Sequence, residues 1–267
     1  YAQKGQISSK DILIISPNKV FADYISNVLP ELGEETVPET SMEQILSDVI
    51  DNKYKHQNFF DQVTELLENP TPDFIERIQY KASFEFISLL DKFILYMENN
   101  YFKATDVKLT KYITIPAEFI NERFHRYPIR QRFETMTGYI LEMMQLQYNL
   151  TVSTPEKNQL KKEIKKMFAG NNDLQIYKNF FEWIGRPEMF KTRKNRILEY
   201  ADLAPLAYLH IALNGNNAQS YVKHLLIDEM QDYSPIQYKV IQKLYPCRKT
   251  ILGDTSQSVN PYGSSTA

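Results

Sequence analysis

The chain has 267 residues, a formal charge of −2 and 43% hydrophobic residues, values that fit one large globular domain or two smaller ones. The slightly negative charge excludes a global positive field, so any nucleic-acid binding would have to come from a local patch. The sequence contains no apolar run of membrane-spanning length and no opening signal peptide, and its single cysteine, Cys247, fits a reducing compartment. We therefore expect a cytoplasmic protein without a membrane partner.

The first predicted element is a strand at residues 11–16, DILIIS, a short β-branched apolar run that ends at Pro17. Asn18 can cap a helix that continues to about residue 29, where Pro30 ends it. A strand followed directly by a helix is typical of an α/β unit. Residues 41–44, SMEQ, then have capping-box spacing before another helical stretch.

The middle of the chain is predicted to be mainly helical. Apolar residues recur at helical period in residues 72–99, 128–150, 156–168 and 174–184. The one convincing strand signal in this region is KYITIP, residues 111–116. Residues 201–213 also indicate a helix, despite Pro205.

The last part of the chain returns to the α/β pattern. Residues 224–227 are predicted to form a strand and residues 235–244 a helix, with Pro235 near its first turn. Residues 249–253 are predicted to form a third strand. Strands of one parallel sheet need crossovers, and a connection of about 200 residues is too long for a loop. We predict an α/β fold with a parallel sheet from residues 1–40 and 200–267 and an inserted helical domain at 41–199.

Two adjacent carboxylates, Asp228 and Glu229, stand where a buried strand meets its following loop. In open α/β sheets the carboxyl ends of the strands form the edge where ligands bind. The first carboxylate can hold Mg²⁺, and the second can deprotonate a water that attacks a γ-phosphate. The alternative is an ordinary polar loop. The next strand also ends in a polar group, Asp254 followed by Gln257, which favours a shared crevice.

Two of these segments together resemble a known family. Residues 225–238, LLIDEMQDYSPIQY, match the Walker B motif of superfamily 1 helicases of the UvrD/Rep type, and residues 251–259, ILGDTSQSV, match motif III of that family. Residues 12–35 are similar to its motif Ia region. Residues 12–35 and 199–209, EYADLAPLAYL, look most like the HelD, or helicase-IV-like, branch.

The resemblance implies a partial RecA-like sheet of the P-loop NTPase type, ATP and Mg²⁺ as cofactors, and DNA, single-stranded or duplex, as a partner. In site residues it implies that Asp228 is the Mg²⁺ ligand and Glu229 the catalytic base. It also places Gln231, Asp254 and Gln257 at the nucleotide site. Asp232, from the same motif as Gln231, would link that site to the nucleic acid. Candidate nucleic-acid contacts are Ser16, Asn18, Lys19 and Tyr262.

The sequence departs from the family pattern in two places. Motif Ia lacks its usual aromatic residue, and residues 259–263, VNPYG, replace an aromatic segment that stacks on single-stranded DNA in the family. These changes put ordinary unwinding in doubt. The resemblance to the HelD branch implies an alternative function, binding RNA polymerase and helping to release it from nucleic acid, in which the helical insert is a protein-interaction module and the altered stacking residues are expected. No G-x-x-x-x-G-K-[ST] loop occurs in the sequence. We therefore expect a fragment of a longer motor protein that cannot hydrolyse ATP alone.

Two basic segments leave alternatives open. Residues 121–133, NERFHRYPIRQRF, interleave arginines with aromatic residues and could grip nucleic acid or an acidic partner. The same pattern is typical of an amphipathic helical surface, which we favour. Residues 160–168, LKKEIKKMF, fit a solvated helix face.

A third hypothesis for the function is a self-contained binding domain without ATPase ancestry. The presence of both motifs argues against it.

Overall fold

The computed structural model describes residues 8–16, 35–108, 112–170, 172–215, 218–258, 260 and 263. The chain divides into two compact units. Unit 1 comprises Tyr1–Leu89, Ile184–Tyr208 and Asn216–Ala267, and unit 2 comprises Leu90–Trp183 and Leu209–Gly215. Among the described residues, no helix has the length and apolarity needed to cross a membrane.

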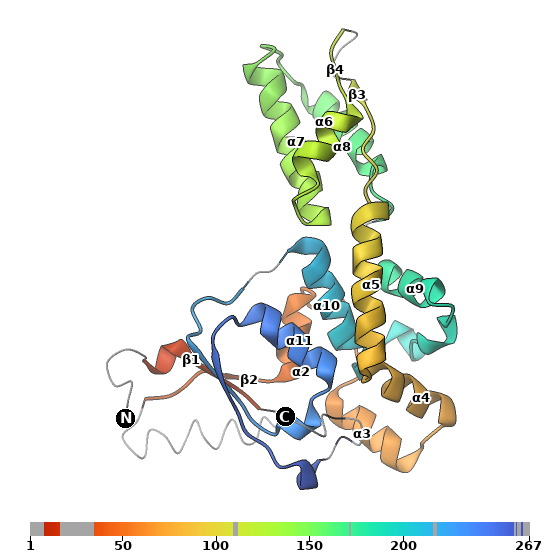
Figure 1. Ribbon diagram of the computed structural model, residues 1–267, viewed down its shortest axis with the longest axis vertical. Coiled ribbons are helices and arrows are strands. Elements are labelled where there is room, and N and C mark those ends of the chain that lie inside the picture. Colours follow the sequence, from red (N-terminus) through yellow and green to blue (C-terminus); the bar gives the residue numbers. More distant parts are fainter. Residues whose placement is uncertain are drawn as a thin grey trace. The chain divides into compact units, whose positions relative to one another are not determined.

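Unit 1 contains a four-stranded parallel sheet in the order β2-β1-β5-β6. Its strands are β1 (Ile12–Ile15), β2 (Glu39–Thr40), β5 (His224–Ile227) and β6 (Arg248–Ile251). Figure 1 labels its strands β1 and β2. The predicted parallel pairing of the three apolar strands is confirmed. The sequence did not reveal β2, because two polar residues give no apolar signal. This strand forms because Ile14 and Ser16 donate their N–H groups to the carbonyl oxygens of Pro38 and Thr40.

The register of the sheet brings three strand ends to one level. Ile15 pairs with Ile227, and Ile227 pairs with Ile251. In β1 and β5 buried and half-buried positions alternate, because successive side chains point to opposite faces of a sheet. β6 lies at the edge of the described sheet and is mostly exposed. The chain therefore leaves β1, β5 and β6 at the same edge.

The helices of unit 1 have clear local causes. They include α2 (Met42–Val49), α3 (Phe59–Glu68), α4 (Pro72–Lys81) and α11 (Pro235–Leu244). The Ser41 side chain accepts the Gln44 N–H at 3.1 Å and starts α2. Ser234 and Gln237 form a capping box at α11, with Pro235 in its first turn. The predicted helix after Asn18 lies outside the described residues.

The predicted helix over residues 72–99 is two helices, α4 and α5 (Phe84–Asn100). Ser83 separates them, because its hydroxyl donates to the Tyr80 carbonyl at 2.7 Å and accepts the Phe86 N–H at 3.1 Å. A side chain that caps the start of one helix while bonding the end of another breaks the run. Both α5 and α10 (Leu203–Asn214) contribute residues to each of the two units.

Unit 2 is mainly helical. It contains α6 (Ala117–Phe124), α7 (Ile129–Leu146), α8 (Thr154–Lys166) and α9 (Asp173–Trp183). A short antiparallel pair joins β3 (Val107–Lys108) to β4 (Thr114–Ile115), which places a strand within the predicted residues 111–116. The helices α6, α7 and α8 share one core that includes Ile120, Phe124, Met136, Ile140 and Ile164.

The helical insert predicted at residues 41–199 and the compact unit 2 do not cover the same residues. Residues 41–89 and 184–199 group with the sheet in unit 1, although they are mostly helical or irregular. The two units are defined by which residues pack together. An inserted domain is defined by how the gene was assembled, so the units do not test the predicted insertion. The insert therefore stays a prediction.

Candidate functional site

The candidate site is the edge of the sheet where β5 and β6 end. Asp228 and Glu229 follow β5 directly, and the Asp228 N–H donates to the Ile15 carbonyl oxygen at 2.9 Å. Met230 donates its N–H to the Leu252 carbonyl oxygen, also at 2.9 Å. The first bond joins the residue after β5 to the end of β1, and the second holds the loop after β5 against the loop after β6. The two predicted loops therefore share this edge.

Glu229 has a left-handed backbone, with φ 51° and ψ 49°. A side chain with a Cβ enters this region at a cost of about 1–3 kcal/mol, and such residues cluster at functional sites. Gln231 and Asp232, in the short turn that follows, are buried. The strain therefore lies at the residue predicted to be the catalytic base.

Gln231 joins the two loops. It is 1% exposed. Its Nε2 donates to the Glu229 carboxylate, and its Oε1 accepts the Asp254 N–H at 3.0 Å. One amide thus fixes the Glu229 side chain and the start of the β6 loop together.

Asp232 makes a second connection between the loops. Its carboxylate accepts the Asn260 N–H at 3.0 Å, and its carbonyl oxygen accepts the Asn260 Nδ2 at 3.0 Å. Ser258 contributes a longer bond from its hydroxyl at 3.4 Å. Residues 228–232 are therefore bonded to residues 254, 258 and 260.

Gly253 is required by this close approach. A Cβ at this position would overlap the Gln231 Oε1 and Met230 Cγ atoms and would lie 2.8 Å from the Met230 backbone nitrogen. A backbone atom cannot rotate away as the end of a flexible side chain can. The first residue of the motif III sequence GD is therefore fixed by packing.

We predict that Gly253→Ala lowers the free energy of unfolding by about 1–3 kcal/mol, because added atoms at a packed position force the loops apart. Gly138→Ala is the matched control. Gly138 lies inside α7 with nothing within 4 Å of an added Cβ, so alanine should raise stability by about 0.5–1 kcal/mol. Urea unfolding of both variants measures the two effects. Equal stabilities would show that the loops are not packed as described.

The Asp254 carboxylate bonds within its own loop. It accepts the Ser256 hydroxyl at 2.7 Å, the Ser256 N–H at 2.9 Å and the Gln257 Nε2 at 3.0 Å. These bonds lower the pKa of the Asp254 carboxyl, with the Ser256 hydroxyl contributing most. Asp254 and Gln257 are exposed at this edge.

A comparison with known protein families shows to which family the chain belongs. The family described as the UvrD/REP helicase N-terminal domain matches residues 5–264. The chain belongs to the UvrD/REP helicase family. No curated protein matches the chain. The four-stranded parallel sheet with its helices is consistent with the RecA-like N-terminal domain of UvrD/REP helicases, a family whose members are ATP hydrolases.

The donor set at this edge fits the way a UvrD/REP helicase would hold Mg²⁺. Within the described part of the chain, no group of three or more His, Cys, Asp or Glu side chains could hold a metal ion. Mg²⁺ is usually held by one or two carboxylates together with waters and substrate phosphates. A half-buried carboxylate at the end of β5, Asp228, suits that mode.

The predicted nucleic-acid residues of this UvrD/REP helicase domain are only partly described. Ser16 follows β1 and is 2% exposed, with its N–H on the Thr40 carbonyl. Asn18, Lys19 and Tyr262 lie outside the described residues. Asn260 was missed by the sequence analysis, although it holds Asp232. The sequence could have indicated Asn260, because it stands two residues after Ser258, where the family pattern has an aromatic residue.

The arginine-rich segment at 121–133 has mixed roles. Arg132 is 3% exposed and donates to the carbonyl oxygens of Tyr127 and His125. Arg130 pairs with Asp173. Arg123 is exposed and lies over the Tyr139 ring at 4.1 Å. Arg132 is therefore structural, whereas Arg123 remains at the surface.

Proposed function

We propose that this chain carries the metal-binding and water-activating carboxylates of an ATP-driven motor that acts on DNA. The observation that carries the proposal is the bonded edge of the sheet, where Gln231 joins Glu229 to the Asp254 backbone. Positioned charges of this kind act in hydrolysis because they need no rearrangement at the moment of reaction. Membership of the UvrD/REP family supports ATP as the nucleotide.

In this mechanism Asp228 would hold the ion, and Glu229 would accept a proton from the attacking water. When bound, Mg²⁺ supplies charge neutralisation of the phosphates. Gln231 keeps the Glu229 carboxylate aimed through its donated hydrogen bond. We assign Asp254 and Gln257 to nucleotide sensing, because the loop that holds them is bonded to Gln231 and Asp232. A change at the γ-phosphate would then reach both loops.

The test of this function is ATP hydrolysis by a protein that contains this chain together with a phosphate-binding loop. Hydrolysis should require Mg²⁺ and should increase when single-stranded DNA is added. The control is the same protein with Lys53→Ala, a change at an exposed residue of unit 1. Absence of DNA-stimulated hydrolysis in the unchanged protein would contradict the proposal.

We also propose that the phosphate-binding loop is supplied by a polypeptide segment other than these 267 residues. A phosphate chain is held mainly by the backbone N–H groups and the lysine of such a loop, and no G-x-x-x-x-G-K-[ST] motif occurs in the 267 residues. The 267-residue chain should therefore bind Mg·ATP with a dissociation constant weaker than about 1 mM. Isothermal titration measures this, and micromolar affinity would count against the proposal.

The alternative function is the one associated with the HelD branch, ATP-driven release of RNA polymerase. The observation that favours it concerns Asn260, which stands where motif III has an aromatic residue. Asn260 is 8% exposed and is hydrogen-bonded to Asp232. A buried asparagine cannot stack on a base. A pull-down with RNA polymerase, set against a strand-unwinding assay, separates the two functions. Unwinding without polymerase binding would eliminate the alternative.

A further inference from the structure

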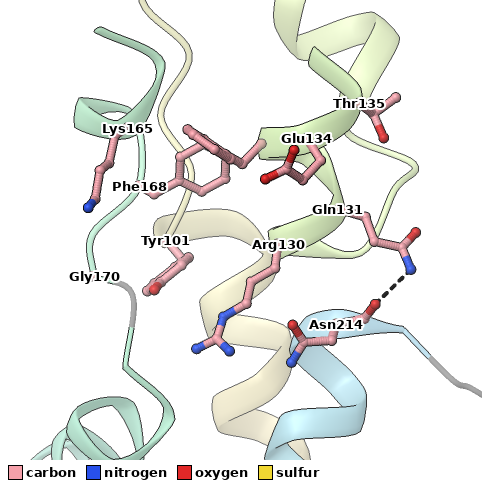
Figure 2. Close-up of a pocket in the computed structure, with 10 residues that line it drawn as sticks. Tyr101, Arg130, Gln131, Glu134, Thr135, Lys165, Phe168, Gly170 and Asn214 are labelled. Carbon is pink, nitrogen blue, oxygen red and sulfur yellow. Dashed lines mark hydrogen bonds between the residues drawn. The ribbon is translucent and has the colours of Figure 1, made fainter. Parts of the chain in front are cut away.

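Unit 2 contains a pocket that the proposed ATP site does not use. Its volume is about 640 Å³, within the range of small-molecule sites. The wall comes from Tyr101 just after α5, the first half of α7, the end of α8 with its following turn, and the last residue of α10 (Figure 2). All of these segments belong to unit 2. The pocket is therefore a property of this unit alone.

An aromatic surface lines one side of the pocket. Phe168 is half-buried, and its ring is held by edge and tilted contacts with Phe133 at 6.0 Å and Phe102 at 5.0 Å. Both Phe168 and Phe133 line the pocket. A ring that its neighbours already fix loses little entropy when a flat ligand stacks on it, which favours a nucleobase.

Polar groups stand around this surface. Figure 2 shows Arg130 and Glu134 extending from α7, with Lys165 on the opposite side. Arg130 is held in place by the buried Asp173, which also bonds His210 at 2.8 Å. Gln131 is fixed by its bond to the Asn214 carbonyl oxygen at 2.7 Å.

Two of these groups have open capacity for a ligand. Lys165 and Glu134 are exposed, and neither forms an ion pair with another described residue. A lysine suits a phosphate as a point charge. A carboxylate accepts from the exocyclic amine of a base, as in the pairing of Glu with the N4 amine of cytosine.

The charge of unit 2 also favours an anionic ligand. Its residues include 14 Lys or Arg and 11 Asp or Glu, a net charge of +3, whereas unit 1 has 17 and 22, a net charge of −5. The overall charge of −2 hides this difference. An uneven charge of this kind points to nucleic-acid chemistry in the positive part.

We propose that this pocket binds one nucleotide whose base carries an amino group. The base stacks on Phe168 with its amine on Glu134, and the phosphate lies between Lys165 and Arg130. The same chemistry is offered by a free nucleoside monophosphate and by one nucleotide of a single strand. This site is separate from the carboxylates after β5, so its test does not depend on ATP hydrolysis.

The experiment titrates the 267-residue chain with dCMP, dTMP and a fluorescent (dC)12 strand. We expect dCMP or (dC)12 to bind. If the natural ligand is a free nucleotide, dTMP should bind at least five-fold more weakly than dCMP. Phe168→Leu and Lys165→Ala should each weaken binding by roughly five-fold or more. Glu134→Gln should remove the preference for cytosine over thymine. Lys161→Ala, on the same helix but outside the pocket lining, is the matched control and should change nothing.

The outcomes separate the two sources. Saturable binding of dCMP that (dC)12 does not exceed assigns the pocket to a free nucleotide, whereas tighter binding of (dC)12 assigns it to a strand. Circular dichroism of each variant confirms folding, and Arg130→Lys, which keeps the charge beside Asp173, provides a milder second variant. The proposal is overturned if neither dCMP nor (dC)12 binds at concentrations up to 1 mM. It is also overturned if the Phe168→Leu and Lys165→Ala variants both bind these ligands as tightly as the unchanged chain.

Discussion

Glu229→Gln is expected to lower steady-state ATP hydrolysis by about 10²–10⁴-fold, the usual cost of losing a positioned base, in an ATP-hydrolysing protein that contains this chain. Glutamine keeps the size and the hydrogen-bonding reach of the side chain, and its carbonyl oxygen can still accept the Gln231 amide. The affinity for Mg·ATP should stay within a few-fold, because Asp228 is assigned to the ion. Nucleotide titration and steady-state kinetics measure the two effects separately.

Asp228→Asn is the matched comparison at the neighbouring residue. A neutral amide is a poorer ligand for a hard cation, so this variant should need more Mg²⁺ for half-maximal hydrolysis. A Glu229→Gln protein that hydrolysed ATP at a near-normal rate would show that Glu229 is not the base. A Glu229→Gln protein with the altered Mg²⁺ requirement instead would show that the two roles are exchanged.

Lys81→Met is expected to lower the free energy of unfolding by about 3–5 kcal/mol, the usual cost of removing one partner from a buried ion pair. Lys81 is 1% exposed, with its Nζ atom 2.6 Å from Asp202 and 3.3 Å from Glu199. Arg77 is bonded to the same Glu199. Methionine fills the space but leaves two buried carboxylates with one cation fewer.

Lys53→Met is the control for the loss of charge. The ion pair of Lys53 with Asp51 is exposed, with side chains 52% and 61% accessible, so the change should cost less than about 1 kcal/mol. Urea unfolding followed by circular dichroism measures both variants. If the two substitutions had similar effects, the cluster around Lys81 would not be the strong link between α4 and residues 199–202 described here.

The buried cluster also lies beside the site. Tyr200, between Glu199 and Asp202, accepts the Gln237 Nε2 at 2.9 Å through its hydroxyl, and Gln237 caps α11 through Ser234. Burial raises the pKa of the Tyr200 hydroxyl, so it stays protonated. Residues 199–209, predicted to resemble the segment before Walker B in the HelD branch, are thus bonded to α11, the helix that follows the Walker B-like residues 228–232.

Three strands of the sheet, the two motifs and the family could be predicted from the amino-acid sequence. Apolar runs near 12–15 and 224–227 identify strands with buried positions, because apolar side chains gain free energy when they leave water. The third strand was predicted at 249–253 and is found at Arg248–Ile251, where it is mostly exposed. Asp228 and Glu229 follow β5 directly, and Asp254 and Gln257 lie in the loop after β6. Parallel strands end at one edge, so their meeting could be predicted from local pattern alone.

Only the tertiary structure decided how these residues are held. The strand β2 exists because β1 supplies its hydrogen-bond partners, and its own residues Glu39 and Thr40 give no sign of it. Gln231 and Asn260 bond groups that are distant in sequence. The pocket beside Phe168 likewise combines α7, α8 and α10. Such long-range contacts depend on packing between segments, which a local pattern of apolar and polar residues does not encode.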